Sequence, residues 1–464
     1  MTVPNWVKDS VFYQIFPDRF ANGNPANDPP NVQPWGATPT VRGFQGGDLA
    51  GIIQKLDVLV DLGINGIYLN PIFLSASTHR YDTMDYFRID PKLGSLEDFN
   101  ALITAAHQRN IRVVLDGVFN HCSRGFFAFN DILENGVDSP YLDWFHVHRL
   151  PLRAYEHGHA RNYEAWWGIK SLPKFNTSNQ AVRRYLLSVA RYWIEQGADG
   201  WRLDVPNEID DDSFWAEFRE TVYQANPQAY TIGEIWEADP RWANATHFDG
   251  LMNYPLRAAL QQFLTGQMSA RQFQQRIESL LALYPRENVY AMYNLLGSHD
   301  TERILTFLDG DLRKVRLAFL FLFAFPGVPS VYYGDEIGLP GGKDPDCRRA
   351  FPWDLEQWDQ NLRGWVKQLI AIRKESAALR QGDYQTLFAD EQRSIYAFAR
   401  RQDNERVLIA MNAAGEPARL ELSAANLGLN NGDQLRSLTD QRTVGVEGDQ
   451  VSILLEPFSG MLLT

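Results

Sequence analysis

The sequence predicts an α/β protein: a (β/α)8 TIM barrel with a domain inserted after its third strand and an antiparallel β domain at its C-terminal end. Three observations predict this fold. Short apolar runs alternate with amphipathic segments of helical length, one connection is far too long for an ordinary loop, and the pattern changes after about residue 378. At 464 residues the chain is also too long for one ordinary domain.

The alternation of apolar and amphipathic segments predicts the barrel. The strand candidates are residues 11–15, 64–69, 111–115, 200–203, 230–235, 250–252, 292–296 and 328–333. Helix-like segments between them include residues 49–62, 96–109, 181–196, 212–225 and 312–325. Eight strands that alternate with helices favour parallel βαβ units closed into a barrel. An open doubly wound sheet is the alternative, but no Gly-rich dinucleotide turn follows the first strand.

The remaining two observations divide the chain. Between His121 and Asn179 lies a stretch rich in aromatic residues, His and Gly, and loops of that length are functional or form a small subdomain. After residue 378, short alternating segments separated by Gly, Asn and Asp turns predict antiparallel strands. We therefore expect a catalytic barrel over residues 1–378, an inserted domain at about residues 121–178 and a β domain over residues 379–464.

Charge and composition exclude some partners. The formal net charge of −13 disfavours nucleic acid or an anionic membrane as a partner, whereas a neutral substrate meets no penalty. Cys122 and Cys347 are too few for a disulfide framework and are expected to be free thiols. The first residues show no secretory signal, and the longest apolar run, residues 317–325, is too short to cross a bilayer. We expect a cytoplasmic enzyme; the sequence leaves open whether it is a monomer or a homodimer.

Polar residues cluster just after four of the predicted strands, where a (β/α)8 barrel carries its active site. These are Asp116 and His121 after the third strand, Arg202, Asp204 and Glu208 after the fourth, Glu234 and Trp236 after the fifth, and His299 and Asp300 after the seventh. A single Asp at a strand end is usually a helix cap or an ion-pair partner. Four such clusters at equivalent positions point to a converging catalytic site.

Paired carboxyl groups in such a site suit glycosidic cleavage. A retaining enzyme uses two of them, about 5–5.5 Å apart, one to attack C1 and one to protonate the leaving oxygen. Arg202 lies two residues before Asp204 and should point to the same side of the strand, which would keep that carboxyl ionised. Glu234 has no cation beside it in sequence, so we expect its pKa to be raised.

Four segments in order, DGVFNH (116–121), GWRLDVPNE (200–208), GEIW (233–236) and GSHD (297–300), resemble the four sequence regions of the α-amylase family of glycoside hydrolases. The resemblance covers essentially the whole chain. It implies Asp204 as nucleophile, Glu234 as general acid/base and Asp300 as transition-state stabiliser. It also places around the reacting sugar Asp116, His121, Arg202, His299 and the stacking residue Tyr81. The long loop corresponds to that family's domain B.

A narrower resemblance concerns substrate. The segment SLPKFN (171–176), and Glu208 shortly after the nucleophile, are similar to features of the neopullulanase, cyclomaltodextrinase and maltogenic amylase group. Asp344 and Arg348 resemble residues that bind sugars toward the non-reducing end. Trp236 resembles an aromatic platform on the leaving-group side, where Glu237 replaces the more usual His. Members of the group usually carry an N-terminal β domain, which the sequence here is expected to lack.

A metal site is implied by a further resemblance, to the calcium loop of related enzymes. Its residues here are Asn22, Asn24, Asn27, Asp28, Gly46 and Asp48. Oxygen ligands at such spacing suit a structural Ca²⁺, and Asn24 stands where an Asp is more usual, which lowers the ligand charge. A plain Asn/Gly/Pro turn cluster is the alternative.

The leading hypothesis is retaining hydrolysis of α-1,4 and some α-1,6 bonds in maltooligosaccharides, cyclodextrins or pullulan, with transglycosylation as a side reaction. A debranching enzyme, or an α-glucosidase or glucosyltransferase acting on sucrose or isomaltose, is a second hypothesis. A third is an inactive amylase-like binding subunit, although Asp204, Glu234 and Asp300 are all present.

Overall fold

The barrel is built from eight parallel strands, in the order β8-β7-β6-β5-β2-β1-β10-β9. The computed structural model describes residues 3–390, 392 and 394–464. A parallel bridge between Met252 and Tyr293 joins the two outer strands, so the sheet is nearly closed. In chain order the strands are β1 (Phe12–Ile15), β2 (Gly66–Leu69), β5 (Arg112–Gly117), β6 (Gly200–Leu203), β7 (Tyr230–Gly233), β8 (Gly250–Leu251), β9 (Tyr293–Leu295) and β10 (Val328–Tyr332). The predicted barrel is confirmed.

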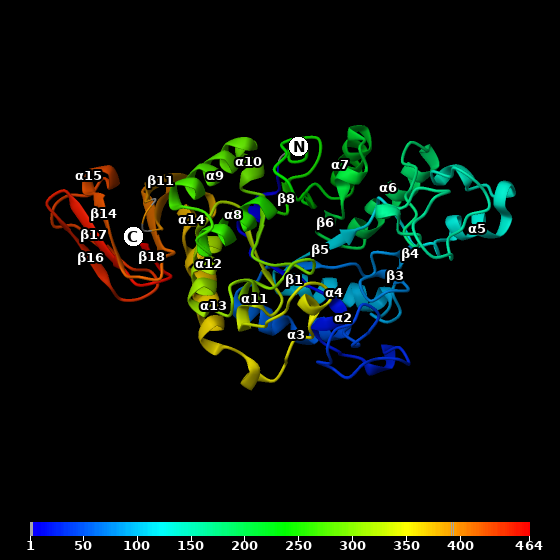
Figure 1. The fold of residues 1–464 in the computed structure, drawn as a ribbon, viewed down its shortest axis with the longest axis horizontal. Coiled ribbons are helices and arrows are strands. Elements are labelled where there is room, and N and C mark those ends of the chain that lie inside the picture. The colour runs from blue at the N-terminus through cyan, green and yellow to red at the C-terminus, as the bar shows by residue number, and fades with distance from the viewer. Residues whose placement is uncertain (1–2, 391, 393) are drawn as a thin grey trace.

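Helices surround the barrel (Figure 1). The longer ones are α3 (Leu49–Leu62), α4 (Leu96–Gln108), α6 (Gln180–Glu195), α7 (Asp212–Ala225), α8 (Tyr254–Leu264), α9 (Ala270–Leu283), α12 (Leu312–Ala324) and α13 (Gln360–Glu375). The shorter ones are α1 (Asn5–Lys8), α2 (Pro17–Phe20), α10 (Arg286–Val289), α11 (Ile304–Phe307) and α14 (Ala377–Gln381). Local sequence sets their ends: a capping box of Ser95 and Asp98 starts α4, and Gly63, at φ 98°, ends α3. Among the described helices, none combines the length and apolar character needed to cross a bilayer.

Side chains alternate along the barrel strands, and this alternation positions the site. In β1, Phe12 belongs to the apolar cluster inside the barrel, whereas Tyr13 packs outward against the helices. In β5 the inward positions are Val114 and then Asp116. Because successive side chains on a strand point to opposite faces, the same inward row passes from apolar residues to polar ones toward the carboxyl ends of the strands. Apolar side chains therefore fill the barrel toward the amino ends of its strands, and polar side chains line it at the carboxyl ends.

The long connection after β5 forms a separate layer beside the barrel, at the right of Figure 1. It contains α5 (Phe127–Asn135) and the short helices η2 (Gly136–Asp138), η3 (Leu142–Trp144) and η4 (Trp166–Gly168). Isolated antiparallel bridges join its distant parts to one another, including those between His121 and Lys174 and between Phe145 and Phe175. A hairpin that the sequence did not predict, β3 (Phe73–Ser75) with β4 (Thr83–Ile89), lies between β2 and α4.

The C-terminal region holds two antiparallel sheets, as predicted, at the left of Figure 1. One consists of β11 (Asp383–Ala389), β12 (Ile395–Gln402), β13 (Glu405–Asn412) and β18 (Ser459–Leu463). The other consists of β14 (Ala418–Ser423), β17 (Gln450–Leu455), β16 (Thr443–Glu447) and β15 (Gln434–Arg436), with α15 (Ala424–Leu427) beside it. Phe398 of β12 packs edge-on against Phe321 of α12, so the first sheet is joined to the barrel.

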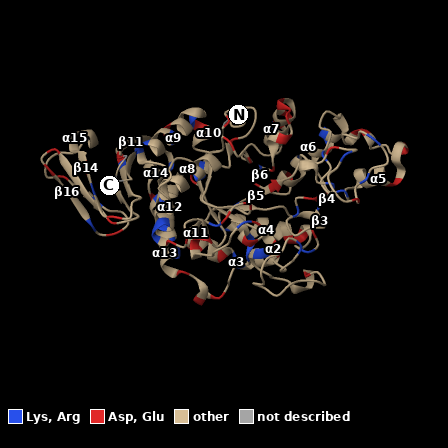
Figure 2. Ribbon diagram, in the orientation of Figure 1, with Lys and Arg blue, Asp and Glu red and all other residues tan. Residues whose placement is uncertain are grey.

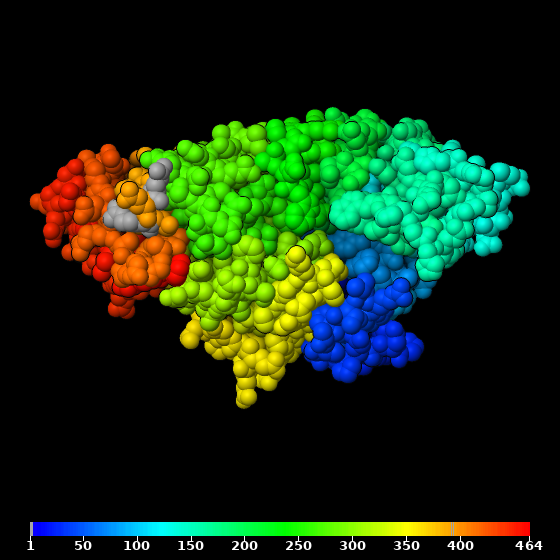
Figure 3. Space-filling view, in the orientation of Figure 1, coloured from blue at the N-terminus to red at the C-terminus, as the bar shows by residue number. Residues whose placement is uncertain are grey.

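Charged residues of both signs are interspersed over the whole fold (Figure 2). Seen from the same side in space-filling form, the inserted segment and the C-terminal sheets make the two ends of the molecule, with the barrel between them (Figure 3). Acidic residues outnumber basic ones, 57 to 44, and in the view of Figure 2 they are spread over the inserted segment, the barrel and the C-terminal sheets.

Candidate active site

One guanidinium group organises the polar end of the barrel. Arg202 in β6 lies beside Asp116 of β5 in the parallel register, and its Nη1 contacts Asp116 Oδ1 at 2.8 Å. The same Nη1 contacts Asp204 Oδ1 at 3.2 Å, and Nη2 contacts Glu234 Oε2 at 2.9 Å. The side chains of Arg202, Asp116 and Glu234 are nearly completely buried, and that of Asp204 is 10% exposed. Residues far apart in the chain are therefore brought together as predicted.

The backbone fixes Glu234 beyond its ion pair. The N–H of Glu234 donates to Leu203 O at 3.0 Å and so extends the ladder between β6 and β7. Val205 adopts a left-handed conformation with φ 36°, and its N–H donates to Glu234 Oε2 at 3.0 Å. The indole of Trp236 donates to Glu234 Oε1 at 3.3 Å. Both carboxyl oxygens thus have a partner, which holds the group in one orientation.

The raised pKa expected for Glu234 is found, whereas that of Asp204 differs from the expectation. Burial raises the pKa of Asp204 well above its usual range, the nearby Glu234 carboxyl raises it further, and Arg202 opposes both effects. Burial also raises the pKa of Glu234, with Arg202 opposing and Asp300 adding to the rise. The sequence interpretation, in which Arg202 kept Asp204 alone ionised, is corrected: the guanidinium contacts both acids and cannot by itself separate their protonation states.

Asp300 has a different environment. His299 Nε2 lies 3.0 Å from its Oδ2, and Arg348 Nη2 lies 3.2 Å from its Oδ1. Burial alone would raise the pKa of Asp300, but the contacts with His299 and Arg348 outweigh it and hold the pKa well below its ordinary value. Arg348 also contacts Asp344 at 3.2 Å, so this predicted pair joins the same network. Both contacts favour the ionised form of Asp300.

Tyr81 connects the two halves of the site. Its hydroxyl donates to Asp116 Oδ2 at 2.7 Å and lies 2.7 Å from His299 Nε2, and its ring is parallel to that of His299 with centroids 5.4 Å apart. Sequence reasoning missed the residues behind it. Tyr68 donates to Asp116 at 2.6 Å and Gln14 contacts His299 at 2.9 Å. Strand periodicity could have identified both residues, because they occupy inward positions near the ends of β1 and β2.

Aromatic rings flank the carboxyl groups. His121 stacks on Trp166 of the inserted segment, with centroids 5.3 Å apart, and Trp236 stacks on Tyr254 at 3.8 Å and 7°. Trp166 and Tyr254 were not predicted as site residues; nothing in their spacing marks them. Glu208 lies in η5 (Pro206–Glu208), directly beyond β6 and half-buried. Flat aromatic faces beside hydrogen-bonding carboxyls suit the apolar faces and hydroxyl edges of sugar rings.

The expected calcium ligands lie together at the start of α3. Asn22 Nδ2 donates to both carboxylate oxygens of Asp28, at 2.9 and 3.0 Å, while its buried Oδ1 has no hydrogen-bond partner among the described residues. Asp48 caps α3 and accepts three backbone N–H groups, and Asn24 donates to Asn27 Oδ1 at 3.3 Å. At Gly46 a Cβ would lie 2.3 Å from Asp28 Oδ1, so only glycine allows this approach.

Comparisons with known proteins agree with this geometry. Residues 14–382 match the family model of the α-amylase catalytic domain, and residues 384–462 match that of the maltogenic amylase C-terminal domain. A cyclomaltodextrinase of Geobacillus thermopakistaniensis is 47% identical over 99% of this chain and 77% of its own length. An intracellular maltogenic amylase of Bacillus subtilis is 41% identical over 92% of this chain and 72% of its own length.

The solved structures include a relative of the same size. The cyclic α-maltosyl-(1→6)-maltose hydrolase of Arthrobacter globiformis superimposes with a TM-score of 0.91 at 41% identity, and the match covers all of both chains. Fold, paired carboxyl groups and sequence matches over both parts of the chain thus lead to one assignment. The chain belongs to the α-amylase family of glycoside hydrolases and hydrolyses α-glucosidic bonds.

Proposed function

We propose that this enzyme is a retaining hydrolase of α-1,4 and some α-1,6 bonds in maltooligosaccharides, cyclodextrins or pullulan, and that it also transfers glycosyl groups. The observation that carries the mechanism is the single guanidinium of Arg202, which contacts both Asp204 and Glu234 and so holds two carboxyl groups on one reacting centre. The substrate class is supported by the relatives, which include a cyclomaltodextrinase and a hydrolase of cyclic α-maltosyl-(1→6)-maltose.

In the proposed mechanism Asp204 attacks C1 of the sugar while Glu234 gives its proton to the leaving oxygen, so that the C1–O bond breaks and a glycosyl ester forms. Glu234, now ionised, takes a proton from water as that water attacks C1 and releases Asp204. A sugar hydroxyl that replaces the water gives transfer. Asp300, held ionised by Arg348 and His299, stabilises the positive charge that develops on the ring.

Product analysis with pullulan and β-cyclodextrin tests the proposal. We expect panose from pullulan and maltose and glucose from the cyclodextrin, with activity lost by about 10²-fold or more in folded Asp204→Ala and Glu234→Gln variants. Maltotriose from pullulan with intact cyclodextrin would indicate a debranching enzyme, and no product from either substrate would favour an α-glucosidase. Variants as active as the parent would contradict the assigned roles and favour a binding subunit.

We also propose that the enzyme works in the cytoplasm. The support is the 41% identical relative described as an intracellular maltogenic amylase. Finding the activity outside the cells of the native host, with none in the lysate, would contradict this location.

We propose further that the loop before α3 holds a structural Ca²⁺. The supporting observation is the buried, unpartnered Oδ1 of Asn22 beside the carboxylate of Asp28, since unpaired oxygens next to a carboxylate suit this cation. Asn22, Asp28 and Asp48 would hold the ion, with Gly46 allowing close approach; it would stabilise the loop without taking part in the chemistry.

Chelation tests the calcium proposal. A bound ion at a hundred times its Kd stabilises the folded state by about 2.7 kcal/mol, so we expect EDTA to lower the urea midpoint and added Ca²⁺ to restore it. Asp28→Asn should remove this response, whereas Asp143→Asn, in the inserted segment, should keep it. An unfolding curve unaffected by EDTA and by Ca²⁺ would show that the loop is a plain turn cluster.

A further inference from the structure

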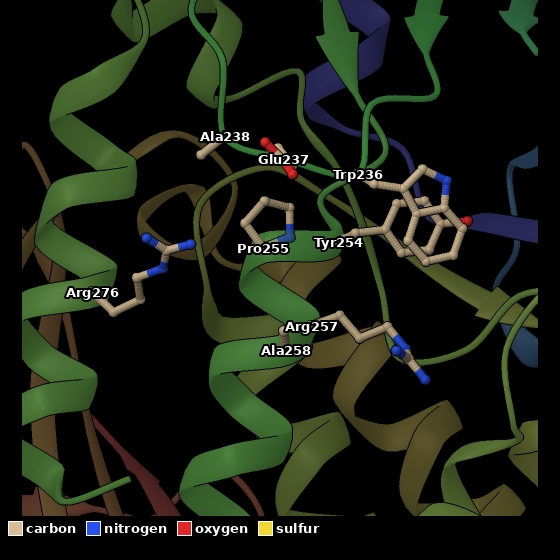
Figure 4. A pocket seen from close by; sticks show the side chains of 8 residues that line it. All are labelled: Trp236, Glu237, Ala238, Tyr254, Pro255, Arg257, Ala258 and Arg276. Carbon is tan, nitrogen blue, oxygen red and sulfur yellow. The ribbon is translucent and has the colours of Figure 1, made fainter. Parts of the chain in front are cut away.

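Two cavities that share part of their walls lie between the sheets of the C-terminal region, beside α15 in Figure 1. They are separate from the space next to Trp236, which adjoins the active site and is shown in Figure 4. Their volumes are about 320 and 210 Å³, and the larger lies within the range of about 300–1,000 Å³ that is usual for ligand pockets. Arg401, Arg406 and Leu427 line both, so the two spaces meet at these side chains.

Strand register brings the two arginines together. Arg401 of β12 lies directly opposite Arg406 of β13 in the antiparallel pair, and the Cβ atoms of such residues are about 4.5–5.5 Å apart. Leu408, two positions after Arg406, belongs to the apolar cluster between the two sheets, whereas Arg400 points the opposite way and contacts the barrel. Burial and the charge of Arg401 both lower the pKa of Arg406. The two guanidinium groups therefore reach the same space between the sheets.

These two guanidinium groups make no hydrogen bond or ion pair with any residue that the structure describes. The carboxylates nearby have other partners or face solvent. Asp383 pairs with Arg286, Glu405 accepts the N–H of Ala378 at 3.1 Å, and Asp403 is exposed in the turn between β12 and β13. Two cations without a fixed counter-charge, in a chain whose formal net charge is −13, form a local site that attracts an anion.

We propose that Arg401 and Arg406 bind the phosphate group of a small phosphate ester, whose organic part lies against the apolar wall of the larger cavity. A phosphate monoester carries a charge of about −1.5 to −2 near pH 7 and three acceptor oxygens, which match two guanidinium groups. A carboxylate has a single charge and would leave one guanidinium without a partner. The apolar wall consists of Leu408, Leu427, Leu429, Leu435 and Leu463.

Adenosine monophosphate (AMP) and adenosine test this, because the two probes differ only in the phosphate group. Isothermal titration calorimetry on the whole chain measures the Kd of each. We expect one AMP to bind per chain, adenosine to bind at least about tenfold more weakly, and inorganic phosphate to displace AMP. Arg401→Ala and Arg406→Ala should each raise the Kd for AMP about tenfold or more, since each removes a charged hydrogen-bond donor. Arg406→Lys, which keeps the charge, should recover part of the affinity.

Arg442→Ala provides the matched control. Arg442 is an exposed arginine of the same C-terminal region, but it pairs with Asp440 at 2.7 Å and lines neither cavity, so the Kd for AMP should stay at the parental value. Far-UV circular dichroism checks that each variant is folded. A parent that does not bind AMP, equal affinity for AMP and adenosine, or a Kd that is the same in Arg401→Ala and Arg406→Ala as in the parent would overturn the inference. An equal loss of affinity in Arg442→Ala would overturn it as well.

Discussion

Asp300 affects both catalytic acids without contacting either through a hydrogen bond. Its negative charge raises the pKa of Asp204 and that of Glu234. The pair is coupled closely enough that its two protons leave in steps that belong to the pair. The reaction needs the form of the pair that carries one proton, with Asp204 as the carboxylate that attacks and Glu234 as the acid that donates, so the first step creates the active form and the second removes it. Both limbs of the pH profile therefore depend on Asp300.

We predict that Asp300→Asn moves both limbs of the kcat/KM profile to lower pH. Removing a negative charge stabilises the ionised forms of Asp204 and Glu234, so each step has a lower pKa. The rate itself should fall by about 10²-fold or more, because a preorganised charge at the transition state is lost. The profile is measured with α-maltosyl fluoride. Asp210→Asn, an exposed carboxyl paired with Arg241, is the control; limbs that stay in place or move to higher pH would contradict the prediction.

Residues on the inward rows of strands were the predictable part of the site. Asp204 and Glu234 follow short apolar strands, and strand periodicity alone places them inside the barrel rim. Trp166 could not be predicted, because it reaches His121 through the irregular backbone of the inserted segment. The contact of one guanidinium with both acids could not be predicted either, because Arg202 lies two residues from Asp204 in the chain but approaches Glu234 only in the folded structure.

Among the elements, the hairpin of β3 and β4 carries Tyr81 into the site. Arg80, just before Tyr81, adopts a left-handed conformation with φ 61°. Its guanidinium is buried and pairs with Asp90 at 2.7 Å, and both side chains are at most 1% exposed. Lys92 also contacts Asp90, at 3.2 Å. The ion pair thus holds the turn backbone from which the Tyr81 side chain extends into the site.

Asp90→Asn should loosen this hairpin. It leaves the Arg80 charge buried without a counter-charge, and breaking a buried pair in this way costs about 3–5 kcal/mol. We expect a lower urea midpoint and a higher KM for maltotetraose, because Tyr81 loses its fixed position. Asp57→Asn, which breaks the exposed pair with Arg109, is the control and should leave both quantities as they are. Equal behaviour of the two variants would show that the hairpin does not depend on its ion pair.

Element positions followed from the sequence wherever hydrophobic periodicity was strong. Each barrel strand begins and ends within two residues of its predicted range, and α3 and α7 match theirs. The hairpin of β3 and β4 was missed because its pairing is bulged and it is stabilised by partly buried polar contacts such as Ser75 with Asp82, not by an apolar alternation that the sequence displays.

At the scale of the whole molecule, the interface between the first C-terminal sheet and the barrel contains buried hydrogen bonds as well as aromatic contacts. Arg400 of β12 is completely buried, and its Nη1 donates to Ala324 O at the end of α12 at 2.6 Å, while Nη2 donates to Gly382 O at 2.9 Å. Tyr396 packs against Phe273 of α9, with centroids 5.2 Å apart. These contacts should make the two parts unfold together.

Tryptophan fluorescence can measure that coupling, because every Trp lies before residue 383. We predict that Arg400→Ala lowers the urea midpoint seen by fluorescence, although the substitution is in the tryptophan-free part. Each carbonyl left unsatisfied costs about 1–3 kcal/mol. Arg401→Ala, at the exposed neighbouring position, should not change the midpoint. A urea midpoint that is the same in Arg400→Ala as in the parent would mean that the barrel unfolds independently of the C-terminal sheets.

The shared guanidinium has a consequence for inhibition. Asp116, Asp204, Glu234 and Asp300 face only two arginines, Arg202 and Arg348, so carboxyl groups outnumber fixed cations among the described residues at the barrel mouth. A ring-nitrogen sugar mimic brings the missing positive charge with it, and it is held most strongly once the carboxyls have lost their protons. Such compounds should therefore gain affinity as the solution becomes more alkaline, up to the point at which their own amine is neutralised.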